Sequence, residues 1–310
     1  MKKSKIRQFI LRHSLTRELF FFFGRRKANL KKIDRALAKG QLTLKKEIAE
    51  NVIVSLTSYG ERIPELKYTL YSLVMQSVRP EKIIVNIAFE DEKYLNEEIK
   101  LFEQYGVEFY LCKDIRSYKK LIPTLQRFPD ACIVTADDDM YYAKDWFKRL
   151  YEAHKTYPDD VCGHLVYKIT YENNTINPYD QWIHNYKIFD TDKDIICIGC
   201  GGILYPPNIF HKDILREELF MELTPMGDDI WFYFMVIFND KHIRQIKKAI
   251  TNLCFVNPYR EYGITEGTTL TQQNVGENKN DEQINKMLSY YNISEQQFID
   301  YISGKNESIL

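Results

Sequence analysis

Three consecutive carboxylates carry the strongest chemical signal in this chain. Asp137, Asp138 and Asp139 directly follow an apolar run, residues 131–136, which reads as a buried strand. Like charges this close repel one another, so something positive must sit beside them, and a divalent cation with hard oxygen ligands is the simplest candidate. In an open α/β sheet, ligands collect outside the carboxyl ends of the strands, where these aspartates would lie. The alternative is a solvated acidic turn that caps a helix expected at residues 143–155.

A second acidic pair opens the most apolar helix that the sequence predicts. Asp228 and Asp229 precede this helix, residues 230–238. Helix capping is the plainest explanation, because the helix dipole and the free N–H groups of a first turn stabilise carboxylates. Farther upstream, Gly199, Gly201 and Gly202 interrupt an apolar segment. Such glycines indicate either a close approach of the backbone to a ligand or a bulge in a strand.

The elements that would position these groups alternate between strands and helices. We expect strands at residues 51–57, 82–89, 107–112, 131–136, 161–171 and 195–205, and helices at 64–76, 92–105, 118–128, 143–155, 230–238, 281–291 and 294–303. The early alternation predicts a right-handed, parallel arrangement of strands. The loop after the first strand contains a single glycine, Gly60, so a dinucleotide-binding glycine motif is disfavoured.

Charge divides the 310-residue chain into a basic arm and an acidic body. Residues 1–50 contain 15 Lys and Arg against 4 Asp and Glu, while the whole chain is neutral. We expect a basic helical extension at residues 1–49, a main domain at 50–255, and a loop with helices at 256–310. An acidic body would repel a phosphate backbone, so we expect no nucleic-acid partner.

The basic arm admits two interpretations. Phe20–Phe23 lie beside the cations Arg25–Lys27, a pattern that fits attachment to an anionic membrane surface. The alternative is a helix docked on the body with its cations in solvent. No apolar run approaches the ~20 residues of a membrane-spanning helix. By elimination we expect a cytoplasmic location, with peripheral attachment to the inner face of the cell membrane as the variant that the arm suggests.

Taken together, these features resemble a GT-A glycosyltransferase of the bacterial family-2-like kind, the group that builds lipopolysaccharide and capsule. The resemblance covers about residues 51–255. It rests on Val54–Tyr59 after the first strand, Asp114 after the third, the Asp137–Asp139 form of the DxD motif, Gly201-Gly202, and Gly227–Asp229. Each motif alone is weak, but five in order are more specific. The resemblance implies a Rossmann-like GT-A fold, with a mixed, mostly parallel central sheet flanked by helices and with helical N- and C-terminal extensions.

The resemblance also implies roles for individual residues. Those that would bind the nucleotide sugar are Thr57, Ser58, Tyr59, Arg62, Asp114, Lys119, Asp137, Asp138, Gly201 and Gly202. Asp114 would bond the base, with uracil favoured, and Asp137 would meet the ribose. Asp139, with Asp137, would hold Mn²⁺ or Mg²⁺, and Asn274 is a candidate for a later ligand. Asp229 matches the general base of inverting members, although Asp228 replaces their Glu, which leaves open which aspartate is the base.

The function implied is a metal-dependent transfer of a sugar from a nucleotide sugar, with UDP-sugar favoured, to a hydroxyl of a glycan or lipid-linked acceptor. We expect inversion at the anomeric carbon and a place in cell-surface polysaccharide synthesis. One alternative is a sugar nucleotidyltransferase, which would need a glycine-rich, basic phosphate loop after the first strand. A different class is a non-catalytic cation-binding module that uses the aspartates structurally.

Overall fold

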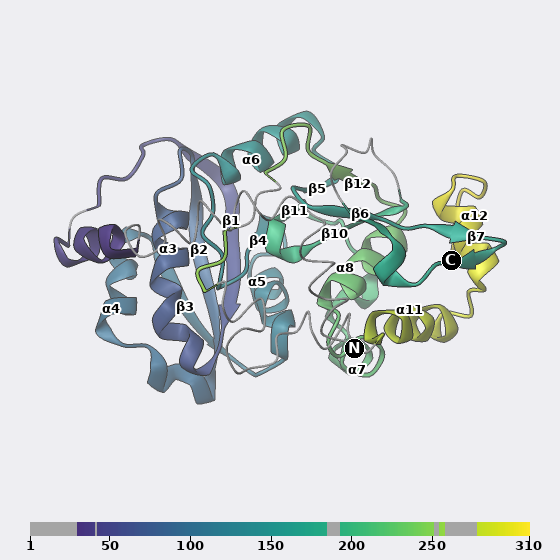
Figure 1. The fold of residues 1–310 in the computed structure, drawn as a ribbon, viewed down its shortest axis with the longest axis horizontal. Helices are drawn as coiled ribbons and strands as arrows, with labels where there is room; N and C mark the ends of the chain where they lie inside the picture. The colour runs from purple at the N-terminus through teal and green to yellow at the C-terminus, as the bar shows by residue number, and fades with distance from the viewer. Residues whose placement is uncertain (1–29, 41, 185–192, 251–253, 258–277) are drawn as a thin grey trace, which may run out of the picture.

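The computed structural model describes residues 30–40, 42–184, 193–250, 254–257 and 278–310. Within these residues the centre is a seven-stranded sheet in the order β12-β5-β11-β4-β1-β2-β3 (Figure 1). Its strands are β1 Ile48–Ser58, β2 Arg79–Ala88, β3 Val107–Cys112, β4 Cys132–Thr135, β5 Val161–Gly163, β11 Ile203–Tyr205 and β12 Ile243–Gln245. β11 runs antiparallel to β4 and β5, and the other neighbouring strands are parallel. The predicted α/β class, with a Rossmann-like, mixed and mostly parallel sheet, is confirmed.

Helices cover both faces of this sheet, which explains the continuous apolar run in β4. Val134 of β4 belongs to one hydrophobic core with side chains of α3 Leu66–Val74 and α6 Trp146–Thr156. The adjacent Ile133 belongs to a second core with α8 Asp228–Ile237. Successive side chains of a strand point to opposite faces, so α3 and α6 lie on one side of β4 and α8 on the other.

Besides α8, the described part of the C-terminal half adds two small sheets and three helices (Figure 1). One sheet has the order β10-β6-β9, and the other is the hairpin of β7 and β8. These elements are β6 Val166–Lys168, β7 Tyr171–Glu172, β8 Thr175–Ile176, β9 Ile183–His184, β10 Ile195–Cys197, α7 Glu217–Leu223, α11 Lys279–Tyr290 and α12 Glu295–Ile302. A capping box between Ser294 and Gln297 opens α12. Short 3₁₀ turns, η5 Tyr179–Gln181 and η7 Lys212–Leu215, connect the rest.

Three of the predicted helices are divided or shortened. The segment 92–105 forms η2 Phe89–Tyr94, α4 Glu97–Lys100 and η3 Leu101–Tyr105. The break falls at Asn96, whose side chain accepts a hydrogen bond from the Ile99 N–H and so begins a new helix. The segment 118–128 becomes η4 Arg116–Lys120 and α5 Ile122–Arg127, because Pro123 has no N–H to continue a helix through it. The helix expected at 64–76 is preceded by the turn η1 Gly60–Glu65 and begins only at α3.

The two long strands predicted in the second half are also wrong as single elements. The segment 161–171 divides between β5 of the seven-stranded sheet and β6 of the three-stranded sheet. The segment 195–205 divides likewise into β10 and β11, and the turn η6 Gly199–Gly201 separates them. Short apolar runs do not reveal which sheet they join, because that depends on long-range pairing.

The described part of the basic extension docks on the body. Residues 30–38 are helical, and Ile33 and Leu37 are buried in the core that contains α3. Asp34 accepts a hydrogen bond from the Tyr68 hydroxyl at 3.1 Å and pairs with Lys67 at 3.3 Å. The Phe20–Phe23 and Arg25–Lys27 segments, and Asn274, lie outside the described residues. Among the described helices, none has the length and apolar character needed to cross a membrane.

Candidate active site

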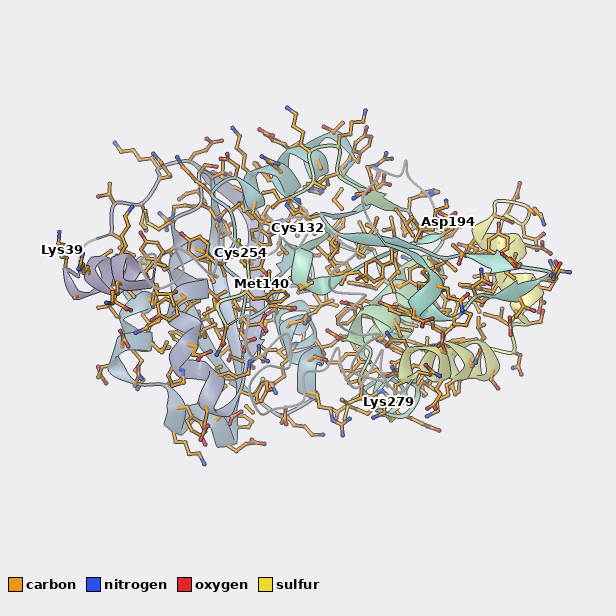
Figure 2. All side chains as sticks on the ribbon, in the orientation of Figure 1. Lys39, Cys132, Met140, Asp194, Cys254 and Lys279 are labelled. Carbon is orange, nitrogen blue, oxygen red and sulfur yellow. The ribbon has the colours of Figure 1, made fainter. Side chains whose placement is uncertain are left out.

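The three consecutive aspartates form a tight turn directly after β4. The Asp137 N–H donates to the Tyr142 hydroxyl oxygen at 2.8 Å, and the Thr69 hydroxyl donates to the Asp138 carbonyl at 2.6 Å. From the far end of the chain, the Val256 N–H donates to the Asp139 carbonyl at 2.6 Å. Figure 2 shows the labelled Met140 and Cys254 in this region, where the two segments lie side by side. The turn is thus held through its backbone, which leaves its carboxylates to other partners.

Arg62 supplies positive charge to two of these carboxylates. Its Nη2 atom lies 2.6 Å from Asp138 Oδ1 and 2.6 Å from Asp139 Oδ2. The Ser58 hydroxyl, at the end of β1, donates to Asp138 Oδ2 at 2.6 Å. Burial would lower the pKa of Arg62, but Asp138 and Asp139 outweigh it and raise the pKa. Three residues that the resemblance assigned to the nucleotide therefore meet in one network.

Lys120 brings the second acidic pair to the first. Its Nζ atom lies 2.8 Å from Asp137 Oδ1 and 3.1 Å from Asp228 Oδ2. The ammonium group is buried, which would lower its pKa, but Asp137, Asp228 and Asp229 more than offset this and raise the pKa well above its ordinary value. Lys120 therefore remains charged, and it joins groups from β4 and α8 that are far apart in the sequence.

The Asp229 carboxylate lies against the backbone of Gly199. Its Oδ2 accepts a hydrogen bond from the Gly199 N–H at 2.9 Å. Its Oδ1 is buried and has no hydrogen-bond partner among the described groups. Burial first, and then the charge of Asp228, raises the pKa of Asp229 to about 7, while Lys120 and the Gly199 N–H act to lower it. A carboxylate with a pKa near neutrality is suited to accept a proton in catalysis.

The remaining residues that the sequence predicts for the site make different kinds of contact. Asp114 and Lys119 pair with each other after β3, and Asp114 is half-exposed. Burial would raise the pKa of Asp114, but hydrogen bonds from Lys119 and the Arg116 N–H lower it below its ordinary value. The Thr57 hydroxyl donates to the Asn86 carbonyl at 2.7 Å, a contact inside the sheet. Tyr59 is 55% exposed, next to Arg62.

Packing accounts for the two glycines expected near the ligand. A Cβ on Gly201 would lie 2.6 Å from the Leu165 Cβ, and one on Gly202 would lie 2.3 Å from the Trp146 ring. Trp146 also donates from Nε1 to the Gly201 carbonyl at 2.7 Å. The glycine that does approach the carboxylates is Gly199, where a Cβ would lie 2.8 Å from Asp229 Oδ1.

The described side chains do not form a ready-made metal site. The oxygens of Asp137 and Asp139 are of the hard type that Mn²⁺ and Mg²⁺ prefer. Asp137, however, pairs with Lys120, and Asp139 pairs with Arg62. No group of three or more His, Cys, Asp or Glu side chains that could hold a metal gathers within the described ranges. The positive charge that the acidic turn requires comes, in this arrangement, from two side chains of the chain itself.

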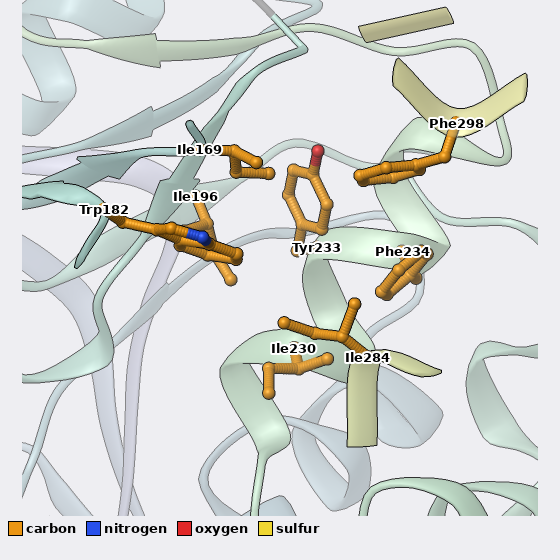
Figure 3. Close-up of a pocket in the computed structure, with 8 residues that line it drawn as sticks. All are labelled: Ile169, Trp182, Ile196, Ile230, Tyr233, Phe234, Ile284 and Phe298. Carbon is orange, nitrogen blue, oxygen red and sulfur yellow. The ribbon is translucent and has the colours of Figure 1, made fainter. Parts of the chain in front are cut away.

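A small apolar cavity lies beyond the site, along the side of α8 (Figure 3). Isoleucines, Trp182, Tyr233, Phe234 and Phe298 line it, and the space inside is about 10 Å³. That is room for little more than one water molecule, and the lining is apolar, so the cavity reflects packing and not a nucleotide site.

Sequence reasoning missed Lys120 and Tyr142, whereas it had grouped Gly199 with Gly201 and Gly202 as glycines that approach a ligand. The only sequence signal for Lys120 was a pair of lysines, Lys119-Lys120, at the start of an otherwise apolar segment. The two side chains project in different directions, as they would in a regular helix, but the irregular turn η4 buries both of them. Lys119 pairs with Asp114 and Lys120 with Asp137.

Comparisons with known proteins yield distant structural likenesses. No family model matches the chain, and no curated protein matches it in sequence. One similar structure is S. aureus TarS 1–349 in complex with UDP, with 14% identity and a TM-score of 0.45 over 64% of this chain and 58% of that one. Another is 4-diphosphocytidyl-2C-methyl-D-erythritol synthase from Anaerococcus prevotii, with 15% identity and a TM-score of 0.41 over 80% and 99%. A third is CMP:2-keto-3-deoxy-manno-octonic acid synthetase complexed with CTP, with 10% identity and a TM-score of 0.40 over 66% and 91%. The chain spans just over half of the TarS structure, and likenesses this distant identify no family.

Proposed function

We propose that this chain is a glycosyltransferase that moves a sugar from a nucleotide sugar to an acceptor hydroxyl, with inversion at the anomeric carbon. The observation that carries the proposal is the meeting of two acidic motifs, Asp137–Asp139 and Asp228-Asp229, around Lys120. Their place beyond the carboxyl end of β4 is where α/β folds bind ligands.

The two motifs are suited to the two halves of such a reaction. Asp229 accepts the proton of the attacking hydroxyl, a role supported by its pKa of about 7. For the other half, we place the departing diphosphate beside the acidic turn and its two cations. Lys120 and Arg62 offer electrostatic stabilisation there. Asp114 and the exposed Tyr59 remain candidates for contacts to the base, with a UDP-sugar as the favoured donor.

The alternative function, that of a sugar nucleotidyltransferase, is less well supported. That reaction needs a basic, glycine-rich loop after β1 to cradle a triphosphate. The loop here, Tyr59–Glu65, holds a single glycine, Gly60, and a single basic residue, Arg62.

A panel of UDP- and GDP-sugars, assayed for hydrolysis and for transfer, tests the proposal. At least one UDP-sugar should be turned over, and Asp229→Asn should lower kcat by about 10²-fold or more with little change in donor affinity. Asp228→Asn is the matched variant, and a loss of kcat confined to it would exchange the roles of the two aspartates. If neither variant loses turnover, the inverting mechanism through this pair is wrong. No binding of UDP in thermal-shift measurements, with or without Mn²⁺, would favour the non-catalytic module.

A further inference from the structure

One buried cation contacts both acidic motifs. Lys120 Nζ is within ion-pair distance of Asp137 Oδ1, at 2.8 Å, and of Asp228 Oδ2, at 3.1 Å. A Cβ built on Gly199 would lie 3.0 Å from Lys120 Nζ and 2.8 Å from Asp229 Oδ1. The ammonium group and the Asp229 carboxylate therefore line the same small space beside Gly199, which a larger residue would fill.

The backbone around Lys120 is anchored to the loop that leads into α8. The Tyr118 hydroxyl donates to the Thr224 carbonyl at 2.5 Å, and Arg116 Nη1 donates to the Pro225 carbonyl at 3.1 Å. Tyr118 is fully buried and stacks on Phe220 of α7. The turn η4 and the start of α8 are thus held as one unit, so Lys120 keeps a fixed position relative to Asp228 and Asp229.

Several groups from different elements act on Asp229. The negative charges of Asp228 and Asp137 oppose its ionisation, and burial opposes it most. Lys120 and the Gly199 N–H favour ionisation, and Lys120 is the one cation among the named influences. The charge of Asp229 also acts on four other titratable groups and raises their pKa values: Tyr118, Tyr179, Cys197 and Tyr205. These four have raised pKa values, chiefly through burial, and so stay neutral near pH 7.

We propose that Lys120 is a positioning residue, whose ammonium group ties the Asp228-Asp229 pair to Asp137 and favours the ionised, proton-accepting form of Asp229. Without it, three carboxylates would face one another in a buried space with no cation between them. The effect on Asp229 rests on the space beside Gly199 that the two side chains share, whereas its consequence for sugar transfer rests on the proposed function.

The test is a titration of Asp229 that does not require activity. The protein is labelled with ¹³C-carboxyl Asp, and Asp229 is assigned as the resonance lost in Asp229→Asn. Lys120→Met should move the midpoint of Asp229 upward by about 1 to 3 pH units, the range for removal of a nearby opposite charge. Lys120→Arg, which keeps the charge, should restore a midpoint near the wild-type value. Lys119→Met is the matched control, because it removes the neighbouring buried lysine, which pairs with Asp114, and should leave the Asp229 midpoint in place.

An unchanged midpoint in a folded Lys120→Met protein would overturn the proposal. Should that variant not fold, Lys120→Gln replaces it, and if both neutral variants are unfolded at every pH, Lys120 is a structural residue and the proposal is wrong. In the transfer assay, the acidic limb of the kcat–pH profile should move with the titration midpoint. If the wild-type protein turns over no nucleotide sugar but the midpoints still move, the proposed function fails while the role of Lys120 stands.

Discussion

At the scale of single residues, the site combines carboxylates that the fold stabilises in opposite ways. Asp138 and Asp139 share Arg62, and Asp228 shares Lys120 with Asp137. Asp229 receives only one backbone hydrogen bond among these contacts, and its pKa rises to about 7. The folded protein therefore holds a proton on Asp229 at a pH where the unfolded chain has already lost it.

This difference predicts how stability depends on pH. Because the pKa of Asp229 is about 7 in the folded protein against 3.8 ordinarily, the unfolded chain loses this proton first, and the stability of the fold falls progressively between about pH 4 and pH 7. Asn resembles the protonated acid, so Asp229→Asn should gain stability over wild type as the pH rises. The gain is at most about 4 kcal/mol above pH 7 and becomes small near pH 4. Urea unfolding at pH 5 and pH 8 measures it.

Asp228→Asn is the control for that experiment. It removes a buried partner of Lys120, so it should lower stability at pH 8, the opposite sign. A stability difference between Asp229→Asn and wild type that is the same at both pH values would contradict the assignment of the perturbed group.

At the scale of elements, short irregular turns place the charged groups. Arg62 comes from η1, Lys120 from η4, and Gly199 from η6. Around these three turns the sequence predicts a loop, a helix and a strand, respectively. Regular strands and helices supply only Asp228, Asp229 and the ends of β1 and β4. The site is therefore sensitive to changes in these turns.

Arg62 and a metal ion should compete for the acidic turn. Mn²⁺ or Mg²⁺ at Asp139 and Asp137 remains a prediction, and a cation there would compete with Arg62, which contacts Asp139 Oδ2 at 2.6 Å, and with Lys120, which contacts Asp137 Oδ1 at 2.8 Å. Arg62→Met should therefore tighten Mn²⁺ binding, and Asp139→Asn should weaken it. Calorimetric titration with Mn²⁺ alone measures both. Absence of Mn²⁺ binding in wild type and in Arg62→Met, together with EDTA-resistant turnover, would remove the metal from this site.

Gly202, which directly follows the turn η6, should matter for stability. Gly202 has φ of +92°, and a Cβ there would overlap the buried Trp146 ring. Gly202→Ala should cost about 3 kcal/mol or more, because it combines backbone strain with overpacking. Gly304→Ala is the matched control, since Gly304 has φ of +75° with no atom near its Cβ position, and it should cost only about 1 kcal/mol. Thermal or urea unfolding compares them, and equal losses would show that the Trp146 contact contributes little.

At the scale of the whole molecule, the N-terminal segment has two parts with different expected roles. Residues 30–38 dock on the body through Ile33 and Leu37. Residues 1–29 carry 9 Lys and Arg and one acidic residue, together with Phe20–Phe23. We expect residues 1–29 to attach the chain to a membrane surface and residues 30–38 to contribute to stability.

Two truncations separate these roles. A chain that begins at residue 30 should keep the melting temperature of the full chain but lose binding to anionic liposomes. Binding by the full chain should fall, without vanishing, as salt rises, because salt screens the cations and not the apolar contacts. A chain that begins at Asn51 should melt earlier, because Ile33 and Leu37 leave the core. Co-sedimentation and thermal unfolding measure the two effects, and equal liposome binding by all three chains would exclude the arm as an anchor.

The sequence by itself determined the features that depend on local pattern. The apolar run before Asp137, the apolar helix after Asp229 and the early alternation of strands and helices predicted the α/β class and the positions of both acidic motifs. Burial on one face leaves a periodic apolar pattern and burial on both faces leaves a continuous apolar run, so these elements could be recognised. The division of residues 161–171 and 195–205 among separate sheets left no such pattern.

Only the tertiary structure decided which charges meet. The sequence suggested a metal ion as the positive partner of the acidic turn, and the structure places Arg62 and Lys120 there. It also places Asp229 against the Gly199 N–H with its Oδ1 atom buried, and that burial, not the motif, raises its pKa. Ion pairing and desolvation depend on distances between groups that are remote in the chain, and a sequence pattern does not contain those distances.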